Sequence, residues 1–483
     1  MGAIVSLHRW MGIAFCLLFA MWFATGIVMH FVPFPSLSDA ERFAGLAPID
    51  ITRVTIGPVD AVQASGIADA TRIRLIQRSD GPTYVVSGPL RLWAVRASDG
   101  ADAAVTSPDV ALAAARDHVS RRGLDASRAS IVQLADYDQW SVPNGFDRHR
   151  PLFRIALGDA RGTEVYVSSV TGEVVLETNR RERAWNFAGS VLHWIYPTIL
   201  RSNWALWDRV VWMLSLLALI GAALGAVLGV VRIRVGQGVA LSPYRGWHAL
   251  HHVIGVIATA FVLTWILSGW LSMDHGRLFS RGELTKHQVM TLLPDWAAAR
   301  STVWPPMSPS AREVEWFALN GKFYRRDRTG LDAQVVFKAG EDLGDGTGSL
   351  NSSDVGEFVG NLANGCAAPS VVAADDDYPA QSNLPGAPVY RTKCGEVWFD
   401  IDAADGHVLQ RWDASRRAYR WLYSALHTLD FPILVLHPRI RSTLIVGLCA
   451  FGLLFAITGI VIGWRRVSYS VPGNVARKDA RKV

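Results

Sequence analysis

Charged residues are scarce in this chain of 483 residues. Asp, Glu, Lys and Arg together make up 19% of the sequence, whereas half of all residues are apolar. That balance is unusual for a soluble protein and is typical of one that lies partly in lipid. The net charge is only +6, and the basic residues form no stripe with interleaved aromatic residues, so the sequence gives no sign of nucleic-acid binding. A chain of this length is expected to form several domains.

Motifs of several common enzyme classes are absent too. The sequence contains no glycine-rich dinucleotide fingerprint after a strand, no Walker motif and no HExxH sequence. Its four cysteines form no CxxC or CxxCH pattern, which argues against a zinc site and against covalently attached haem c. Cys16 and Cys449 lie in apolar runs and are expected to be core residues. Cys366 and Cys394 share one hydrophilic loop and can pair if that loop faces an oxidising compartment.

Four apolar runs are each about 20 residues long, which is enough to cross the hydrocarbon core of a membrane. They lie near residues 10–32, 209–231, 252–273 and 442–464. We interpret the first run as a retained helix, because it is longer than the apolar part of a signal peptide and no clear cleavage site follows it. Arginines and lysines gather at the run ends that face one side, which predicts that both termini are cytoplasmic. The two large segments between the runs then lie outside, in the periplasm of a bacterium.

These external segments have the pattern of small soluble domains. Alternating apolar residues predict short strands, and Ser107 is expected to precede an amphipathic helix. The strands are expected at 72–77, 83–86, 152–156, 165–168 and 174–176. The stretch 340–386 is rich in Gly, Ser, Asn, Pro and Asp and is expected to be loop. In the first half of the chain, the predicted plan is a first span at 1–33, an external domain at 34–182, and a Leu-His helix with the second span at 183–234. A cytoplasmic loop follows at 235–247. The second half has a third span at 248–273, a second external domain at 274–416, a Leu-His helix with the fourth span at 417–466, and a cytoplasmic tail at 467–483.

The sequence also repeats itself once. The segment 7–12 returns as 250–255, and 192–193 returns as 426–427, each time with a histidine at the same place. Each copy consists of a span, an external domain, a helix that ends in Leu-His, and a second span. Because each copy has an even number of spans, the two copies share one orientation, and a two-fold axis along the membrane normal should relate them. We therefore expect a four-helix membrane bundle with two external α+β domains.

Four histidines occupy matched places in the two copies. His8 and His251 begin the first and third spans, and His193 and His427 precede the second and fourth. Ionisable groups at membrane depth are costly and usually functional. Two imidazoles that face each other from different helices are suitable ligands for a b-type haem. We predict two haem sites, an inner one at His8 and His251 and an outer one at His193 and His427, which together carry electrons across the membrane.

Other assignments of these histidines stay open. Each one has an ordinary interpretation as an interfacial residue that is hydrogen-bonded to headgroups or backbone. His30 lies near the outer end of the first span, where the other copy has Met273, and it is an alternative partner for the outer pair. His252 and His248 lie close to His251 and are alternative ligands of the inner site. A glycine follows each inner histidine by four residues, and it either clears space for the haem plane or permits close helix packing.

Several short motifs follow one another along the chain. They are His-Arg-Trp-Met-Gly at 8–12, Thr-Gly at 25–26, Val-Thr-Gly-Glu-Val at 170–174, Ser-Gly at 268–269, and the two Leu-His pairs. In this order they resemble the PepSY-associated transmembrane family, which includes iron-regulated inner-membrane proteins and ferric-siderophore reductases that hold two b-type haems in a four-helix bundle. The resemblance implies PepSY-like external domains and a one-electron reduction of chelated ferric iron in the periplasm. It also supports His8, His251, His193 and His427 as haem ligands.

The sequence therefore favours an inner-membrane oxidoreductase that contains two haems b per chain and reduces a ferric siderophore or another ferric chelate. The cytoplasmic segments are too short for a flavin or nicotinamide domain, so we expect the electrons to come from a quinol or from a separate cytosolic reductase. The alternative is a non-redox PepSY membrane protein that senses the envelope or binds and inhibits a periplasmic protease. A metal or siderophore permease is less favoured, because four spans leave little room for a transport pathway.

Overall fold

The computed structural model describes residues 2–234, 241–340 and 346–470, which divide into two compact units. The helical unit consists of Met1–Phe34, Ala184–Phe279 and Ala418–Val483, and the strand unit consists of Pro35–Arg183 and Ser280–Arg417. Much of the predicted cytoplasmic loop at 235–247 and of the predicted tail at 467–483 lies outside the described residues.

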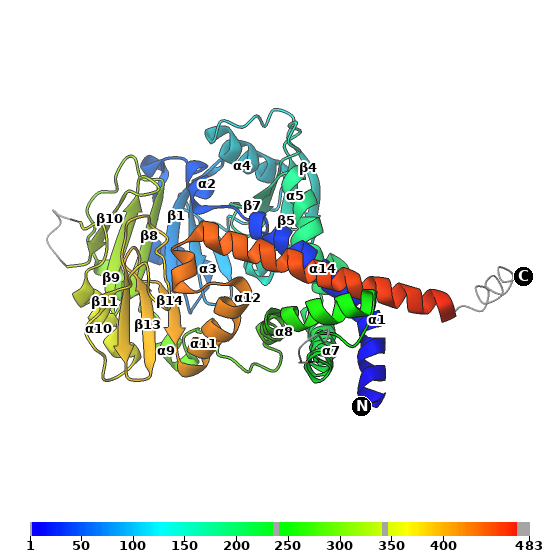
Figure 1. The fold of residues 1–483 in the computed structure, drawn as a ribbon. Helices are drawn as coiled ribbons and strands as arrows, with labels where there is room; N and C mark the ends of the chain where they lie inside the picture. The colour runs from blue at the N-terminus through cyan, green and yellow to red at the C-terminus, as the bar shows by residue number, and fades with distance from the viewer. Residues whose placement is uncertain (1, 235–240, 341–345, 471–483) are drawn as a thin grey trace, which may run out of the picture. The chain divides into compact units, whose positions relative to one another are not determined.

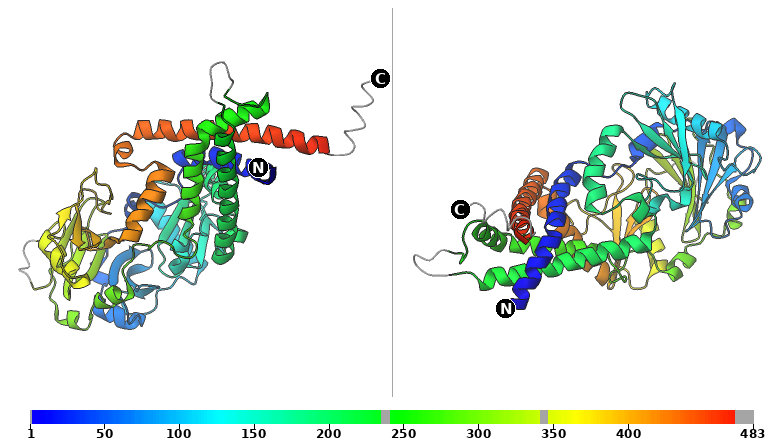
Figure 2. Two further views of the ribbon diagram at one scale, coloured as in Figure 1. Left: turned by 60° about the horizontal axis from the view of Figure 1, so that its bottom comes forward. Right: turned by 90° about the vertical axis from the view of Figure 1, so that its right-hand side faces the viewer.

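Four long helices form most of the helical unit. They are α1 (Gly2–Phe31), α7 (Trp204–Val231), α8 (Trp247–Ser272) and α14 (Pro438–Ser470). Each is long and apolar enough to cross a membrane, which confirms that the four predicted spans are helices of sufficient length. Helix α1 contacts α7 and α14, and α8 contacts the same two helices (Figures 1 and 2). Phe23, Ala258 and Val262 are buried where these helices meet.

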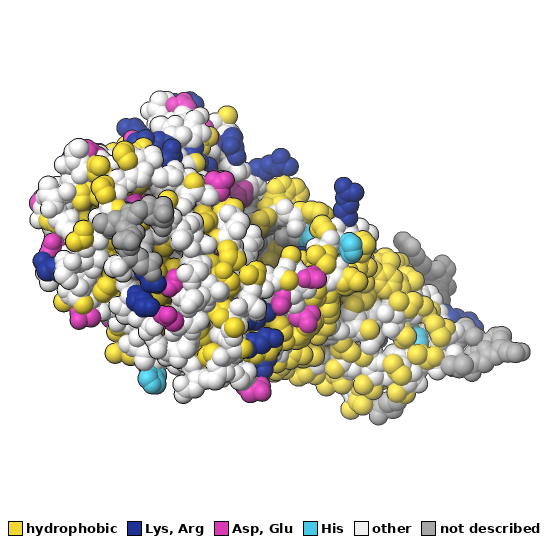
Figure 3. Space-filling model, turned by 90° about the vertical axis from the view of Figure 1, so that its left-hand side faces the viewer, with side chains coloured by type: hydrophobic (Ala, Val, Ile, Leu, Met, Phe, Trp, Pro, Cys, Tyr) yellow, Lys and Arg dark blue, Asp and Glu magenta, His cyan; other side chains and the backbone are white. Residues whose placement is uncertain are grey.

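The outer surface of these helices is apolar. Large hydrophobic side chains such as Leu17, Val227 and Leu454 are exposed there. Figure 3 shows hydrophobic side chains gathered over the helices, whereas charged side chains are scattered over the strands. A surface of this kind suits contact with lipid tails.

Short helical segments precede α7 and α14. The first consists of α5 (Arg180–Asn186) and a π-helical stretch, Phe187–Val191, and the second of α11 (Ala414–Tyr419), a π-helical stretch, Arg420–Ala425, and α12 (Leu426–Thr428). The π-helix is rare and is often found at functional sites. His193 and His427 follow the two π-helical stretches at matched positions. The remaining short helices are α2 (Asp39–Ala44), α3 (Pro58–Ser65), α6 (Thr198–Arg201), α9 (Lys286–Thr291) and α13 (Pro432–Val435), with 3-10 turns at Ile51–Arg53, Asn144–His149 and Ala298–Ser301.

A six-stranded antiparallel sheet lies at the centre of the strand unit, with the strand order β10-β9-β8-β1-β2-β3. Its strands are β1 (Arg72–Arg78), β2 (Gly81–Ser87), β3 (Leu92–Arg96), β8 (Glu313–Leu319), β9 (Lys322–Arg328) and β10 (Gln334–Lys338). Strands β1 and β8 pair so that Arg74 lies opposite Glu315, and this pairing joins the two external segments in one sheet. One face of the sheet is apolar and buries Ile73, Leu75 and Val314.

Two smaller four-stranded sheets complete this unit. One has the order β4-β5-β6-β7 and the other β11-β12-β13-β14. Their bounds are β4 (Ser130–Ala135), β5 (Leu152–Ala156), β6 (Glu164–Ser168), β7 (Val174–Thr178), β11 (Ser370–Val371), β12 (Val389–Cys394), β13 (Val397–Asp402) and β14 (Val408–Trp412). Helix α4 (Pro108–Arg121), capped by Ser107 as expected, packs on the first sheet, and α10 (Ser352–Leu362) packs on the second. The strands predicted in the first external segment are therefore confirmed.

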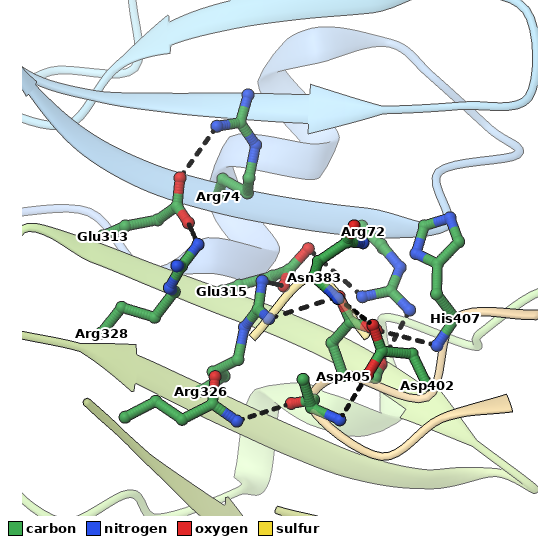
Figure 4. A network of polar contacts seen from close by, with 12 residues as sticks. Arg72, Arg74, Glu313, Glu315, Arg326, Arg328, Asn383, Asp402, Asp405 and His407 are labelled. Atoms are coloured by element: carbon green, nitrogen blue, oxygen red, sulfur yellow. Dashed lines mark hydrogen bonds and ion pairs between the residues drawn. The ribbon is translucent and has the colours of Figure 1, made fainter. Parts of the chain in front are cut away.

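The second face of the central sheet is charged and nevertheless buried. Glu313 lies between the guanidinium groups of Arg42 (2.7 Å), Arg74 (3.1 Å) and Arg328 (3.4 Å). On the same face Arg326 contacts Glu315 at 2.6 Å (Figure 4). The turns of the two smaller sheets complete this network, since Glu173 binds Arg74 and Asp405 binds Arg326. Ion pairs therefore join the sheets around Glu313 and Glu315, whereas farther along the same face Phe317 and Leu319 pack against Phe399 of β13 in an apolar cluster.

The predicted loop at 340–386 is partly wrong. It contains α10 and the short strand β11, and Asn351 caps the helix by accepting a hydrogen bond from the Asp354 backbone N–H at 2.8 Å. Val355, Phe358 and Leu362 lie on one face of this helix and are buried. Three apolar side chains at helical spacing were enough to form the helix, although Gly, Ser and Asn dominate the local composition.

Candidate functional site

The inner histidines line a common cavity in the helical unit. Its volume is about 920 Å³, at the upper end of the range for small-molecule sites. His8 and His251 contribute from the second turns of α1 and α8, and Gly12 and Gly225 also line the cavity. A side chain at Gly12 would meet nothing within 4 Å, so this glycine leaves open space beside His8. By contrast, a Cβ at Gly255 would lie 2.9 Å from the Phe455 ring, so that glycine serves helix packing.

Hydrogen bonds fix both inner imidazoles through Nδ1. The Nδ1 of His8 lies 3.1 Å from the carbonyl oxygen of Gly221, which can only accept, so this nitrogen carries the proton. The Nδ1 of His251 lies 2.8 Å from the Thr458 hydroxyl, which already donates its own proton to the Phe455 carbonyl oxygen. In both residues Nδ1 therefore donates, and Nε2 keeps a lone pair for a metal. The ring of Phe455 stacks on His251 with a centroid distance of 4.8 Å.

The outer histidines are fixed in the same way. Thr25 donates to the Met21 carbonyl oxygen, so its hydroxyl accepts from Nδ1 of His193 at 2.9 Å. His427 contacts the carbonyl oxygen of Trp265 at 3.2 Å through Nδ1, which lies 3.1 Å from the Ser268 hydroxyl. Thr25 and Ser268 stand at matched positions of the two copies. All four predicted ligands thus share one tautomer, with Nδ1 protonated and Nε2 available.

The outer pair is also close enough to share one metal. The ring centroids of His193 and His427 lie 6.4 Å apart. Two imidazoles on opposite sides of one metal ion have centroids roughly 6 Å apart, because each metal–nitrogen bond is about 2 Å long. Just beyond the anchoring hydroxyls, Gly269 leaves room for the His427 imidazole, since a Cβ there would lie only 3.1 Å from its Cε1, whereas a Cβ at the matched Gly26 would make an ordinary contact of 3.8 Å with Cε1 of His193.

A comparison of the chain with known protein families identifies its family. Residues 5–466 match the model of the family described as the PepSY-associated TM region. The chain belongs to the PepSY-associated TM family. The match includes most of the four long helices and the two segments that form the strand unit. No curated protein matches the chain.

The donor set in this PepSY-associated TM protein suits haem better than a bare metal ion. Among residues 2–234, 241–340 and 346–470, no group of three His, Cys, Asp or Glu side chains is placed to hold a metal. A structural zinc ion needs four protein ligands. A haem supplies four nitrogens of its own and would need only two imidazoles from the protein, so a pair of histidines would be enough to hold it.

The alternative ligands are placed differently. The Nε2 of His252 lies 2.9 Å from the Gly229 carbonyl oxygen, so it carries the proton, and the buried Nδ1 has no hydrogen-bond partner. This is the opposite tautomer from that of His251, although both side chains line the cavity together with His248. The Nε2 of His30 binds the Ser442 hydroxyl of α14 at 2.8 Å rather than joining the outer pair.

The sequence analysis did not predict the hydroxyl groups that hold the outer histidines, nor the contact between His275 and Asp208. Thr25 and Ser268 were noticed as parts of the repeat but not as partners of His193 and His427. The sequence analysis also gave no partner for His275, whose Nδ1 lies 2.6 Å from the buried carboxylate of Asp208 and whose ring lies 4.7 Å from that of Trp212. An acidic residue at the start of an apolar span was the available signal, because such residues are costly in membranes and usually have a partner.

Proposed function

We propose that this protein is a transmembrane oxidoreductase that holds two b-type haems and passes electrons to an acceptor in the periplasm. The observation that carries the proposal is the shared tautomer of His8, His251, His193 and His427. A metal-ligating histidine usually donates its other ring N–H to a carbonyl or a similar acceptor, as these four do. His8 and Thr25 lie 17 residues apart on α1. At a rise of about 1.5 Å per residue, the two sites are separated by roughly 25 Å along that helix.

The fold proposed for this activity is a four-helix bundle built from two copies of one unit. Its support is the order of elements, because a long helix, three strands, a helix, four strands, a π-helical stretch and a second long helix occur twice. The antiparallel pairing of β1 with β8 is the contact expected between equivalent strands across a two-fold axis. This axis would run along the membrane normal and bring one histidine of each copy to each haem.

The residues of the chain have defined tasks in this proposal. His8 and His251 would hold the inner haem, and His193 and His427 the outer one. Haem supplies reversible one-electron transfer when it is bound. The hydroxyls and carbonyls at Nδ1 set the ring orientations and make the imidazoles stronger electron donors. Apolar side chains such as Phe455 exclude water from the inner site.

The acceptor we propose is ferric iron in a siderophore or another chelate, because reduction weakens its binding to hard oxygen ligands and releases the metal. A quinol or a cytosolic reductase would supply the electrons. The protein would lie in a bacterial inner membrane with both termini in the cytoplasm and the strand unit in the periplasm. The disulfide between Cys366 and Cys394 supports an oxidising environment for the strand unit.

Re-oxidation by chelates tests this function. The purified protein is reduced with dithionite, freed of excess reductant without oxygen, and mixed with a ferric siderophore. We expect the reduced haem bands to disappear while ferrous iron forms in a one-to-one ratio with the electrons lost. The matched control is the gallium(III) complex of the same chelator, which has a similar shape but accepts no electron. Bands that persist with every ferric chelate but vanish with ferricyanide would contradict the proposed acceptor.

Replacing Gly225 with alanine should disable the inner site alone. Gly225 lies on α7, and a Cβ at this position would lie 2.6 Å from Cε1 of His8, so the His8 imidazole would have to move away from α7. We expect haem affinity at the inner site to fall roughly tenfold or more, which is about 1.4 kcal/mol. Titration of the haem-free protein, followed by its Soret absorbance, measures this. Gly447→Ala on α14 is the control, because its Cβ meets nothing within 4 Å and both sites should fill normally.

A further inference from the structure

The mouth of the inner cavity carries a concentration of positive charge that the histidine pair does not explain. Arg9 of α1, Arg245 just before α8, and Arg465 and Arg466 of α14 all line the cavity. These four side chains are exposed at one end of the helices, and the Arg465 guanidinium lies over the Trp247 ring at 5.8 Å. Among the described residues that line the cavity, none is Asp or Glu.

The four arginines place several positive charges at one end of the cavity. A charge beside a low-dielectric wall acts more strongly on an ion of opposite charge than it does in open water. Deeper in the cavity the lining is apolar and includes Phe15, Phe19 and Phe455. The cavity is therefore built for an amphiphilic ligand with an apolar body and an anionic edge of more than one charge.

We infer that Arg9, Arg245, Arg465 and Arg466 bind the two carboxylates of the inner haem at the cytoplasmic end of the cavity. The inference rests on the proposed function and adds the orientation of the cofactor and the residues that fix it. A b-type haem has an apolar macrocycle with two carboxylates on one edge, which matches an apolar depth and a cationic mouth. Arginine is well suited to this task, because its planar fork binds a carboxylate through two hydrogen bonds.

The neighbouring arginines allow a sharp comparison. Arg232 and Arg234 follow α7 and belong to the same basic set, yet they do not line the cavity. If these six arginines only reflected the general preference for basic residues on the cytoplasmic side, none of them would matter more than the others for haem binding. Binding of haem carboxylates would involve only the four in the lining.

The experiment compares protohaem with its dimethyl ester, in which both carboxylates are blocked. Each pigment is titrated into full-length, haem-free protein that carries His193→Ala, so that only the inner site is left to fill. We expect protohaem to bind roughly tenfold more tightly than the ester, because four exposed pairs each contribute a modest amount. The double substitution Arg9→Gln with Arg465→Gln should reduce the ratio of the affinities for protohaem and for the ester to about twofold. Arg9→Lys with Arg465→Lys should keep part of the preference for protohaem. Arg232→Gln with Arg234→Gln should leave the ratio unchanged.

Each other outcome has a defined meaning. Equal affinity for the two pigments overturns the inference and leaves the haem site itself intact. A preference for protohaem that survives removal of Arg9 and Arg465 overturns it as well. The same titration in micelles with acidic phospholipid tests for competition by lipid phosphates. If the arginines bind lipid phosphates, the preference for protohaem over the ester is lost in these micelles. That result also overturns the inference and assigns the mouth of the cavity to lipid. If neither pigment binds, the proposed function fails together with the inference.

Discussion

The His193→Ala protein is expected to contain one haem per chain, where the proposed function predicts two for the unaltered protein. The ring centroids of His193 and His427 lie 6.4 Å apart, and removal of one imidazole would leave only one histidine to hold the outer haem. The inner site should be unaffected, because Thr25 near one end of α1 holds His193 whereas His8 lies near the other end. A pyridine haemochrome assay on purified protein counts the haems, and the reduced-minus-oxidised spectrum should retain the inner band.

The matched control for this prediction is His30→Ala. His30 lies on the same span and near the same end of α1, but its ring binds Ser442. Two haems should therefore remain after this substitution. If His193→Ala kept both haems, or if His30→Ala lost one, the pairing of His193 with His427 would be refuted, although haem binding itself would stand.

Glu313→Gln should destabilise the strand unit by about 3–5 kcal/mol, the usual cost of removing one partner from a buried ion pair. The carboxylate of Glu313 is 2% exposed and contacts the guanidinium groups of Arg42, Arg74 and Arg328. The neutral amide would leave these guanidinium groups buried with less compensating charge. Thermal unfolding of the full-length protein, followed by tryptophan fluorescence, measures the effect. Glu357→Gln is the control, because its pair with Lys322 is exposed and contributes about 0.2–1 kcal/mol.

The same carboxylate makes stability depend on pH. Burial alone would raise the pKa of Glu313, but Arg42 and Arg74 outweigh it and hold the pKa well below the ordinary value of 4.5. A lowered pKa means that the unfolded chain binds the proton more readily. The contribution of Glu313 is therefore complete above about pH 4.5 and is lost as the pH falls through the lower folded pKa. Unfolding temperatures of the unaltered protein should drop in that acidic range, and Glu313→Gln should flatten this part of the curve.

Local patterns predicted the spans and many strands correctly. Apolar runs of about 20 residues became four helices, because burial of a backbone in lipid requires that its hydrogen bonds be made within the helix. Period-two alternation at 72–77 became β1. The alternation did not reveal that the arginine face of this strand is buried. That burial depends on Glu313, Glu315 and Asp405, which lie more than two hundred residues away in the sequence.

The four candidate histidines were predicted from the sequence because the repeat marked them, and their role as ligands stays a prediction. Their anchors were not, since the partner of His193 is Thr25 from the preceding span and the partner of His8 is a backbone carbonyl on another helix. A backbone carbonyl has no sequence signal. The sequence also could not distinguish His251 from His252, because adjacent residues point in different directions on a helix and only their hydrogen-bond partners indicate the tautomer.

The haem content of the purified full-length protein, produced with ample haem, is the most direct measurement of the central claim. The account predicts a Soret band, b-type bands in the reduced-minus-oxidised spectrum, and two haems per chain in the pyridine haemochrome assay. A folded protein that shows no Soret absorbance and takes up no haem on titration would contradict it.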